Sequence, residues 1–233
     1  MSGNDPHDNR DERFALLAHE LRNPLAALAN AAEILAQYAG SHTGLERVSG
    51  IVQRQTAVMR KLVEELLDVS RLDHERLAMR MSVLDLRDVA RDGVADHREA
   101  LAHAAPDWHL GLPPRAVPVR RDAVRLGQVL ANLLANAIKF TPAPGSVHVR
   151  VEVQGAAALL TVRDTGIGIA PELLDAVFDR YRQASAGRSG GLGLGLPIAK
   201  GIVELHGGEI TASSTGLGRG CTIAVRLPLA AAH

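Results

Sequence analysis

The most informative segment of this chain reads FALLAHELRNPLAAL, from Phe14 to Leu28. Its apolar residues recur every three or four positions, which marks one face of an α-helix. These residues are Phe14, Leu17, Leu21, Leu25 and Leu28. His19 lies on the flank of this face beside Glu20. Pro24 has no amide hydrogen that could bond to the carbonyl of Glu20, so we expect the helix to bend just past His19. The imidazole of His19 would then have an acidic neighbour and some local freedom, which a reactive histidine needs.

The composition is that of a soluble protein without bulk charge. The 233 residues suffice for one or two domains, and 26 Lys and Arg balance 26 Asp and Glu, so the formal net charge is zero. Nothing in this balance favours nucleic acid or an anionic membrane as a partner. The single cysteine, Cys221, fits a reducing compartment, so we expect a cytoplasmic location. No apolar run approaches the roughly 18 residues of a membrane segment.

Two helical patterns follow each other in the first third of the chain. One covers residues 11–39, the other covers residues 45–73, and the glycines in residues 40–44 separate them. The second pattern has a heptad seam made of Leu45, Val48, Val52, Gln55, Met59, Leu62, Leu66 and Val69. Two long helices with a short connection predict an antiparallel hairpin. One hairpin cannot bury both seams, so we expect two copies to form a four-helix bundle, which makes the protein a homodimer.

The pattern changes near residue 80, where a mixed α+β domain is expected. We predict a disordered or linking segment at 1–10, a linker at 74–82 and the second domain at 83–229. Alternating apolar residues predict strands at 83–86, 108–110, 117–119, 147–153, 158–163, 209–213 and 221–227. Helical periodicity predicts helices at 88–104, 122–140 and 196–205, with Asp122 as the cap of the second. Helices layered on a sheet are the expected architecture.

The helix predicted at 122–140 carries a polar face. Asn132, Asn136 and Lys139 are spaced four and three residues apart and therefore share one side of the helix. A side-chain amide together with substrate phosphates can hold Mg²⁺, and a lysine can neutralise phosphate charge. The alternative is that the two asparagines satisfy buried backbone groups and that Lys139 is solvated. Taken alone, the spacing leaves both interpretations open.

Asp164 ends a predicted strand and begins the segment DTGIG, which contains Gly166 and Gly168. A carboxylate at this position can accept a hydrogen bond from an exocyclic amine such as that of adenine. The glycines allow the backbone to approach a flat ring closely. An ordinary Asx turn at the end of a strand is the alternative.

Alternating glycines at Gly191, Gly193 and Gly195 precede the last predicted helix. This pattern favours a mobile lid with an anion site at the start of the helix. Its spacing matches neither the Walker nor the Rossmann motif. A flexible surface loop is the alternative. Arg182 and Arg188 are candidates for phosphate contacts in this lid.

The order of these motifs resembles the catalytic core of two-component sensor histidine kinases. HELRNP, which begins at His19, is similar to the phosphoacceptor box of that family, and the segment from Asn132 to Lys139 is similar to its asparagine box. DTGIG and GLGLG are similar to its two glycine boxes, with Phe178 between them. The resemblance implies a dimerisation and phosphoacceptor hairpin over 11–73, followed by a Bergerat-type α/β-sandwich that binds ATP.

The resemblance also implies roles for the residues of the hairpin. His19 would be phosphorylated, and Glu20 would orient its imidazole and take up its proton. Asn23 stands where the family has threonine or asparagine, a position linked to phosphatase activity. The receiver domain of a response regulator would accept the phosphoryl group on an aspartate. Input would come from a sensor domain or protein that the sequence does not identify.

In the second domain, the resemblance implies a binding site for ATP and Mg²⁺. Asn136 would be the Mg²⁺ ligand, Asn132 would support it, and Lys139 would contact phosphate. Asp164 would bind the adenine amine. The pocket and its lid would be shaped by Gly166, Gly168, Gly191, Gly193 and Gly195.

Two other classes of protein are alternatives. One is an ATP-driven conformational machine of the same ATP-binding superfamily, in which the ATP domain comes first and a later domain adds a lysine. Here the ATP-like motifs come last, after the HELRNP segment. The other is a non-enzymatic protein, either a dimeric scaffold or a phosphotransfer module, with a degenerate ATP site. The intact Asn136, Asp164 and glycine motifs argue against it.

Overall fold

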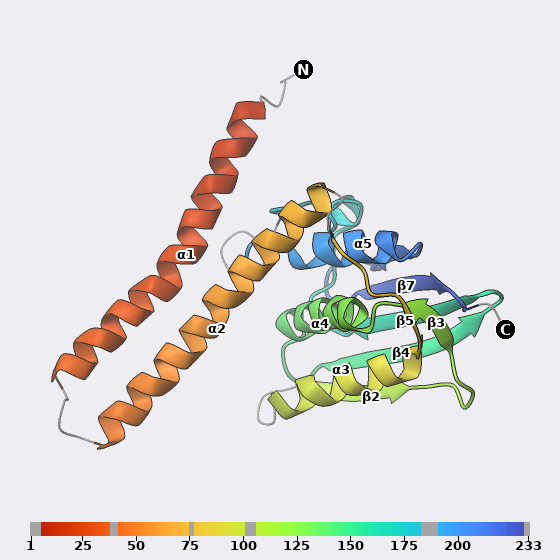
Figure 1. Ribbon diagram of the computed structural model, residues 1–233, viewed down its shortest axis with the longest axis horizontal. Helices are drawn as coiled ribbons and strands as arrows, with labels where there is room; N and C mark the ends of the chain where they lie inside the picture. Colours follow the sequence, from red (N-terminus) through yellow and green to blue (C-terminus); the bar gives the residue numbers. More distant parts are fainter. Residues whose placement is uncertain (1–5, 38–41, 75–76, 101–105, 183–190, 231–233) are drawn as a thin grey trace.

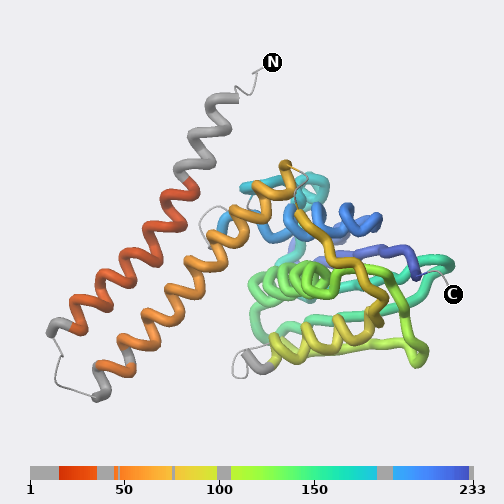
Figure 2. Tube along the Cα trace, in the orientation of Figure 1, coloured from red at the N-terminus to blue at the C-terminus, as the bar shows by residue number. Residues whose placement is uncertain are grey.

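The computed structural model describes residues 6–37, 42–74, 77–100, 106–182 and 191–230, and it consists of a long helical hairpin followed by an α/β domain (Figures 1 and 2). The hairpin helices are α1 (Pro6–Gln37) and α2 (His42–Asp73). The hairpin prediction is therefore confirmed, although α1 begins earlier than residue 11. Part of the connection expected at 40–44 lies outside the described residues. The helix α1 continues through Pro24 without interruption.

The hairpin leaves apolar side chains exposed along its length. Within the predicted seam of α2, Val48, Leu62 and Val69 are buried. Leu45 and Val52 of the same seam are 47% and 40% exposed. Further exposed apolar residues of the hairpin are Leu25, Leu35, Val58, Val63 and Leu67. A single copy of the chain therefore exposes more apolar surface along the hairpin than is usual for a monomeric protein. None of the described helices is long and apolar enough to cross a lipid bilayer.

The α/β domain contains a five-stranded sheet and a separate two-stranded one. Its strands are β1 (Ser82–Asp85), β2 (Asp107–Gly111), β3 (Pro118–Arg121), β4 (Ser146–Gln154), β5 (Ala157–Asp164), β6 (Glu209–Ser213) and β7 (Thr222–Pro228). The large sheet has the order β2-β4-β5-β7-β6, and β1 pairs with β3. The pair β2–β4 is parallel, and the other pairs are antiparallel.

Three helices cover one face of the large sheet (Figure 1). They are α3 (Leu86–Ala100), α4 (Ala123–Phe140) and α5 (Gly195–Leu205), and a short 3-10 helix spans Pro171–Leu173. Alternate strand residues point into this layer; they are Val147, Val149 and Val151 on β4, Leu160 and Val162 on β5, and Ile223, Val225 and Leu227 on β7. The expected helical hairpin followed by an α/β sandwich is confirmed. The last positions of the helix predicted at 88–104 lie outside the described residues.

His206 ties the end of α5 to the start of α4. Its Nε2 accepts a hydrogen bond from the backbone N–H of Asp122 at 3.0 Å. Its Nδ1 donates to the carbonyl of Ile202 at 2.9 Å. Asp122 also caps α4, because its side chain accepts from the N–H of Arg125 at 3.1 Å. The same carboxylate accepts from the N–H of Arg80, before β1, at 2.7 Å. This arrangement requires a neutral imidazole, since a proton on Nε2 would face another donor.

The stability of the domain should therefore fall as the pH drops below about 6.5. Burial is the main cause of the lowered pKa of His206, and the neighbouring Arg121 acts in the same direction. The unfolded chain binds a proton below its ordinary pKa, whereas the folded imidazole resists it, so acid favours unfolding. His206→Gln should lower the free energy of unfolding at pH 7.5 by about 1–2 kcal/mol. It should also flatten the decline between pH 7 and 5.5 in urea titrations, and an unchanged decline would contradict this role.

Candidate active site

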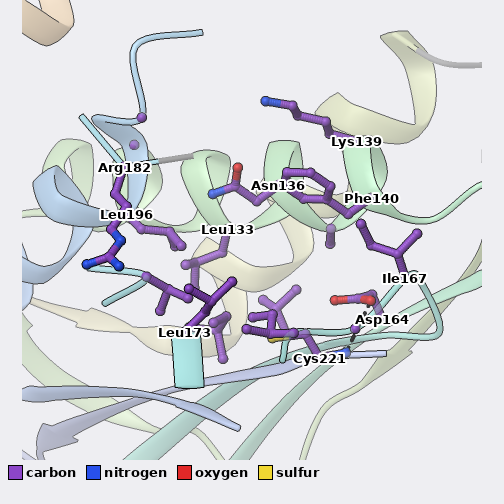
Figure 3. Close-up of a pocket in the computed structure, with 18 of the residues that line it drawn as sticks. Leu133, Asn136, Lys139, Phe140, Asp164, Ile167, Leu173, Arg182, Leu196 and Cys221 are labelled. Atoms are coloured by element: carbon purple, nitrogen blue, oxygen red, sulfur yellow. Dashed lines mark hydrogen bonds between the residues drawn. The ribbon is translucent and has the colours of Figure 1, made fainter. Parts of the chain in front are cut away.

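A cleft opens between α4 and the sheet, with the start of α5 at one side (Figure 3). The predicted residues that line it are Asn136, Lys139, Asp164, Gly168, Gly191, Gly193 and Gly195. Apolar side chains from α4, the sheet and the segment after β5 form much of the remaining wall; they include Leu133, Val162, Ile167, Leu173 and Ile223. Most of the motifs singled out in the sequence therefore meet around one cavity, although they are distant along the chain.

Asp164 is buried at the end of β5, with 8% of its surface exposed. Its Oδ1 accepts hydrogen bonds from the N–H groups of Gly166 at 2.8 Å and Cys221 at 3.2 Å. Burial raises the pKa of this carboxyl, and the backbone N–H groups partly oppose that effect. The bond to Gly166 is an Asx turn, so the alternative interpretation of this residue also holds. Oδ2 takes part in neither bond, which leaves an acceptor at the cleft (Figure 3).

Glycines are required around Asp164 because other parts of the backbone approach closely. A Cβ on Gly166 would lie 2.0 Å from the carbonyl oxygen of Phe140. Gly168, with φ 68°, would place a Cβ 2.2 Å from the carbonyl oxygen of Gly216. Gly220, with φ 69°, would place one 2.1 Å from the carbonyl oxygen of Asp164. These glycines pack the chain against itself and so build the site in which the carboxylate is held.

The polar face of α4 contacts both the cleft and the helix α5. Asn132 Nδ2 donates to the carbonyl of Gly195 at 3.1 Å, which holds the first residue of α5. Asn136 lines the cleft, and Lys139 lies at its exposed rim (Figure 3). Partial burial lowers the pKa of Lys139, and the negative charge of Glu20 opposes this shift. Asn132 therefore supports the wall of the site without lining it.

The glycine-rich segment before α5 closes one side of the cleft. Gly193 has φ 66°, and a Cβ there would lie 2.7 Å from the carbonyl oxygen of Arg182. Arg182 itself lines the cleft. Arg188, the second phosphate-contact candidate, lies outside the described residues. Phe178 is half-buried against the core, in agreement with an ordinary packing role.

The hairpin reaches the edge of this cleft through Glu20. The backbone N–H of Gly191 donates to Glu20 Oε2 at 2.8 Å. His19 is exposed beside it, and Asn23 is exposed one helical turn further on. The acid that follows the exposed histidine is thus in contact with the glycine-rich rim of the cleft.

The oxygen and nitrogen atoms that the described residues place at the cleft suit a metal ion that arrives bound to a substrate. They do not form a site in which the protein alone surrounds the ion. Among the described residues, no three His, Cys, Asp or Glu side chains come together to hold an ion. Asn136 supplies one amide oxygen at the cleft. Mg²⁺ keeps several waters and binds through one or two protein oxygens plus phosphates, so a single amide fits that mode.

Sequence reasoning missed several residues of the site. Cys221 donates its N–H to Asp164 and lines the cleft, and burial together with the Asp164 charge raises the pKa of its thiol to about 12. Gly220 was missed although the run GLGRG at 216–220 is glycine-rich. Apolar lining residues such as Leu173 carry no signal that separates them from core residues.

Comparison with known proteins agrees with this geometry. Residues 121–231 match the family described as histidine kinase-, DNA gyrase B- and HSP90-like ATPase. Residues 9–75 match the His Kinase A (phospho-acceptor) domain. The sensor histidine kinase RppB of Synechocystis sp. is 35% identical over 227 residues, which are 96% of this chain and 50% of RppB. The chain spans half or less of the length of RppB and of two further curated relatives, DivJ of Caulobacter vibrioides and TcrY of Mycobacterium tuberculosis.

Solved histidine kinases share the fold. Full-length ShkA, solved in complex with AMPPNP, has a TM-score of 0.71 at 25% identity over 95% of this chain and 46% of ShkA. Histidine kinase ThkA, solved in complex with the response regulator protein TrrA, has a TM-score of 0.70 at 22% identity over 94% of this chain and 61% of that one. The second likeness concerns the fold alone.

Gly166→Ala should damage the cleft, because the added methyl group meets the backbone of Phe140. We expect the free energy of unfolding to fall by about 1–3 kcal/mol. Affinity for a fluorescent ATP analogue should fall with it. Gly127→Ala on α4 is the matched control, since no atom lies within 4 Å of its added Cβ. That variant should gain about 0.5–1 kcal/mol, and equal effects of the two substitutions would refute the close-packing argument.

Proposed function

The chain belongs to the two-component histidine kinases and carries their catalytic core, and on this premise we propose that it phosphorylates His19 with ATP and passes the phosphoryl group to an aspartate of a response regulator. The observation that supports this most directly is the 2.8 Å hydrogen bond from Gly191 to Glu20. This bond brings Glu20, the acid beside His19, to the rim of the cleft. The cleft lies in the domain that matches the ATPase family. The contact between Gly191 and Glu20 supports His19 as the acceptor of the phosphoryl group.

The buried end of the cleft is suited to adenine. Asp164 Oδ2 can accept a hydrogen bond from the 6-amino group, while Oδ1 is engaged by the backbone at Gly166 and Cys221. The apolar wall formed by residues such as Leu133 and Ile167 can contact the faces of the ring. The AMPPNP complex of ShkA supports a nucleotide as the occupant.

The phosphates would extend toward Asn136, Lys139 and Arg182. Asn136 is the proposed ligand of Mg²⁺, which when bound neutralises phosphate charge and helps to align the terminal phosphoryl group. Lys139 adds a positive charge at the rim, and Arg182 is placed to add another. Phosphoryl transfer depends mainly on such positioning and charge stabilisation.

At the reacting centre, a ring nitrogen of His19 attacks the γ-phosphorus of ATP. The new N–P bond forms as the bond to the bridging oxygen breaks, and ADP leaves with that electron pair. Glu20 takes the proton from the other ring nitrogen, so the phosphorylated imidazole is left neutral. The exposure of His19 leaves room for this approach.

A receiver domain would then dock on the hairpin near His19, and its aspartate would accept the phosphoryl group. The match of residues 9–75 to a phospho-acceptor domain supports the hairpin as the donor in this step. Asn23 lies one turn from His19 and is exposed, so its amide can align a water that dephosphorylates the regulator. We place the protein in the cytoplasm, with input from a sensor domain or protein acting through the hairpin.

Incubation with Mg²⁺ and γ-labelled ATP should give a label that survives base and is lost in acid, which is the behaviour of a phosphohistidine. His19→Gln should abolish labelling and bind an ATP analogue with unchanged affinity, because His19 is outside the cleft lining. Asn136→Ala should reduce labelling by weakening Mg²⁺–ATP binding.

Three outcomes would contradict the proposal in different ways. Acid-labile label on His19→Gln would exclude His19 as the acceptor. ATP hydrolysis without any phosphohistidine would favour a conformational machine. Failure to bind the ATP analogue would favour a scaffold with a degenerate site.

We also infer that two copies pair through their hairpins to form a four-helix bundle. The support comes from the exposed apolar residues of α1 and α2, including Leu25 and Val52. The match to the phosphoacceptor domain over residues 9–75 agrees with this arrangement. Burial of such surface against a second hairpin would remove it from water.

Val52→Glu should therefore weaken the dimer, because it would put a charge into the proposed bundle. We expect the dissociation constant to rise by about tenfold or more in sedimentation experiments. Val124→Glu on α4 is the matched control, since Val124 is 79% exposed in the other domain. A Val52→Glu protein that remains as dimeric as this control would contradict pairing through the α2 seam.

A further inference from the structure

Asp68 of α2 is buried where the hairpin meets the α/β domain, with 5% of its surface exposed. Arg125 Nη1 donates to its two carboxylate oxygens at 3.2 and 3.3 Å. Gln128 Nε2 donates to Oδ2 at 2.6 Å. Arg125 Nη1 also donates to Gln128 Oε1 at 2.7 Å. The three side chains form a closed polar network, which we call the Asp68 clamp, between α2 and α4.

The clamp joins two domains and is not part of the core of either one alone. Asp68 is 57 and 60 residues away from Arg125 and Gln128 along the chain. A carboxylate this deeply buried is strongly unfavourable unless it is paired and hydrogen-bonded. Arg71 of the same helix lies 3.8 Å from Oδ1, whereas the hydrogen bonds come from the guanidinium of Arg125 and the amide of Gln128 on α4. These directional bonds strongly favour one relative placement of α2 and α4.

The clamp and the cleft share one face of α4. Arg125, Gln128, Asn132, Asn136 and Lys139 follow each other at intervals of three, four, four and three residues. The N-terminal part of this face holds α2, and the C-terminal part lines the cleft. Because α4 is one continuous helix, the placement of its first turns determines where Asn136 and Lys139 lie relative to the hairpin.

Helix α2 presents a corresponding face to the α/β domain and runs between that domain and α1 (Figure 1). Leu72, one turn beyond Asp68, packs closely on Gly201 of α5. A Cβ added to Gly201 would lie 2.9 Å from Leu72 Cδ1. One turn before Asp68, Glu65 is within electrostatic range of Lys139. The clamp thus lies in the middle of a docking surface.

We propose that Asp68 is a positioning residue for the phosphorylation of His19. Together with Arg125 and Gln128, it docks the α/β domain on α2 so that Gly191 meets Glu20 at the rim of the cleft. This inference rests on the proposed function and adds to it the residues that align the two domains. Asp68 touches neither the cleft nor His19, so it acts on the reaction through α4.

Asp68→Asn keeps the shape of the side chain and removes its charge. We expect the maximal rate of autophosphorylation to fall about tenfold or more. The KM for ATP should stay within about twofold of the wild-type value, since the cleft is intact. Asp88→Asn is the matched control, because Asp88 is paired with Arg91 on the distant surface of α3 and should label at the wild-type rate.

A charge exchange separates docking from a general loss of structure. Asp68→Arg and Arg125→Asp should each abolish rapid labelling, and the double variant Asp68→Arg/Arg125→Asp should recover a substantial part of it. Aspartate at position 125 falls in the first turn of α4, where a negative charge is favourable. A double variant no faster than the single ones would overturn the proposal.

A crosslink measures docking without any need for activity. The double variant Leu72→Cys/Gly201→Cys should form a disulfide rapidly. The disulfide should form at least tenfold more slowly when Asp68→Arg is added to this pair. It should form rapidly again when both Asp68→Arg and Arg125→Asp are added. Equal crosslinking in all three backgrounds would overturn the docking role. Faster labelling by Asp68→Asn, a wild-type rate or a raised KM would also overturn it. Absence of label on the wild-type protein with the expected crosslinking pattern would count against the proposed function and not against the clamp.

Discussion

Helix α4 packs against the sheet, α3, α5 and α2 at once, and the rest of the molecule is arranged around these contacts. Its apolar face is buried against the sheet and α3 through Leu126, Val129, Leu130, Leu133, Leu134 and Ala137. Its polar flank binds α2 through Arg125 and Gln128, holds α5 through Asn132, and lines the cleft with Asn136. A rotation of α4 about its axis would disturb all of these contacts together, because they share a single helical period. The helix therefore links the core, the cleft and the hairpin.

The cleft contains a carboxylate that is held by the backbone. Asp164 has one oxygen engaged by two N–H groups, and the chain passes close enough to make glycine necessary at Gly166 and Gly220. This construction fixes the direction of the remaining oxygen before a ligand arrives. A preformed acceptor in a partly apolar cavity suits a planar base with an amino group, in agreement with the ATPase family match. In the proposed reaction, only the terminal phosphoryl group then has to reach the hairpin.

Much of this architecture could be predicted from the sequence, because the apolar residues recur at regular spacing and the motifs follow one another in a fixed order. Heptad spacing in α2 and alternation in β4 and β5 predicted the hairpin and the sheet. The motifs from His19 to Gly195 indicated the family through their order. The Asp68 clamp left no such trace, since an aspartate in a helix and an arginine 57 residues later have no periodic relation. Gly220 and Cys221 were missed because the strand β7 brings them to Asp164 only after the sheet has formed.

The length of α4 gives the clamp a mechanical consequence. From Arg125 to Lys139 the helix rises about 21 Å, so the clamp lies at one end of a rigid lever and the rim of the cleft at Lys139 lies at the other. A tilt of about 5° at the clamp moves the far end by about 2 Å. A misplacement of about 1 Å can slow a reaction that depends on alignment by about a hundredfold. A hairpin that twists or slides by a fraction of a helical turn therefore has enough leverage to switch the proposed phosphorylation of His19 on or off without any refolding.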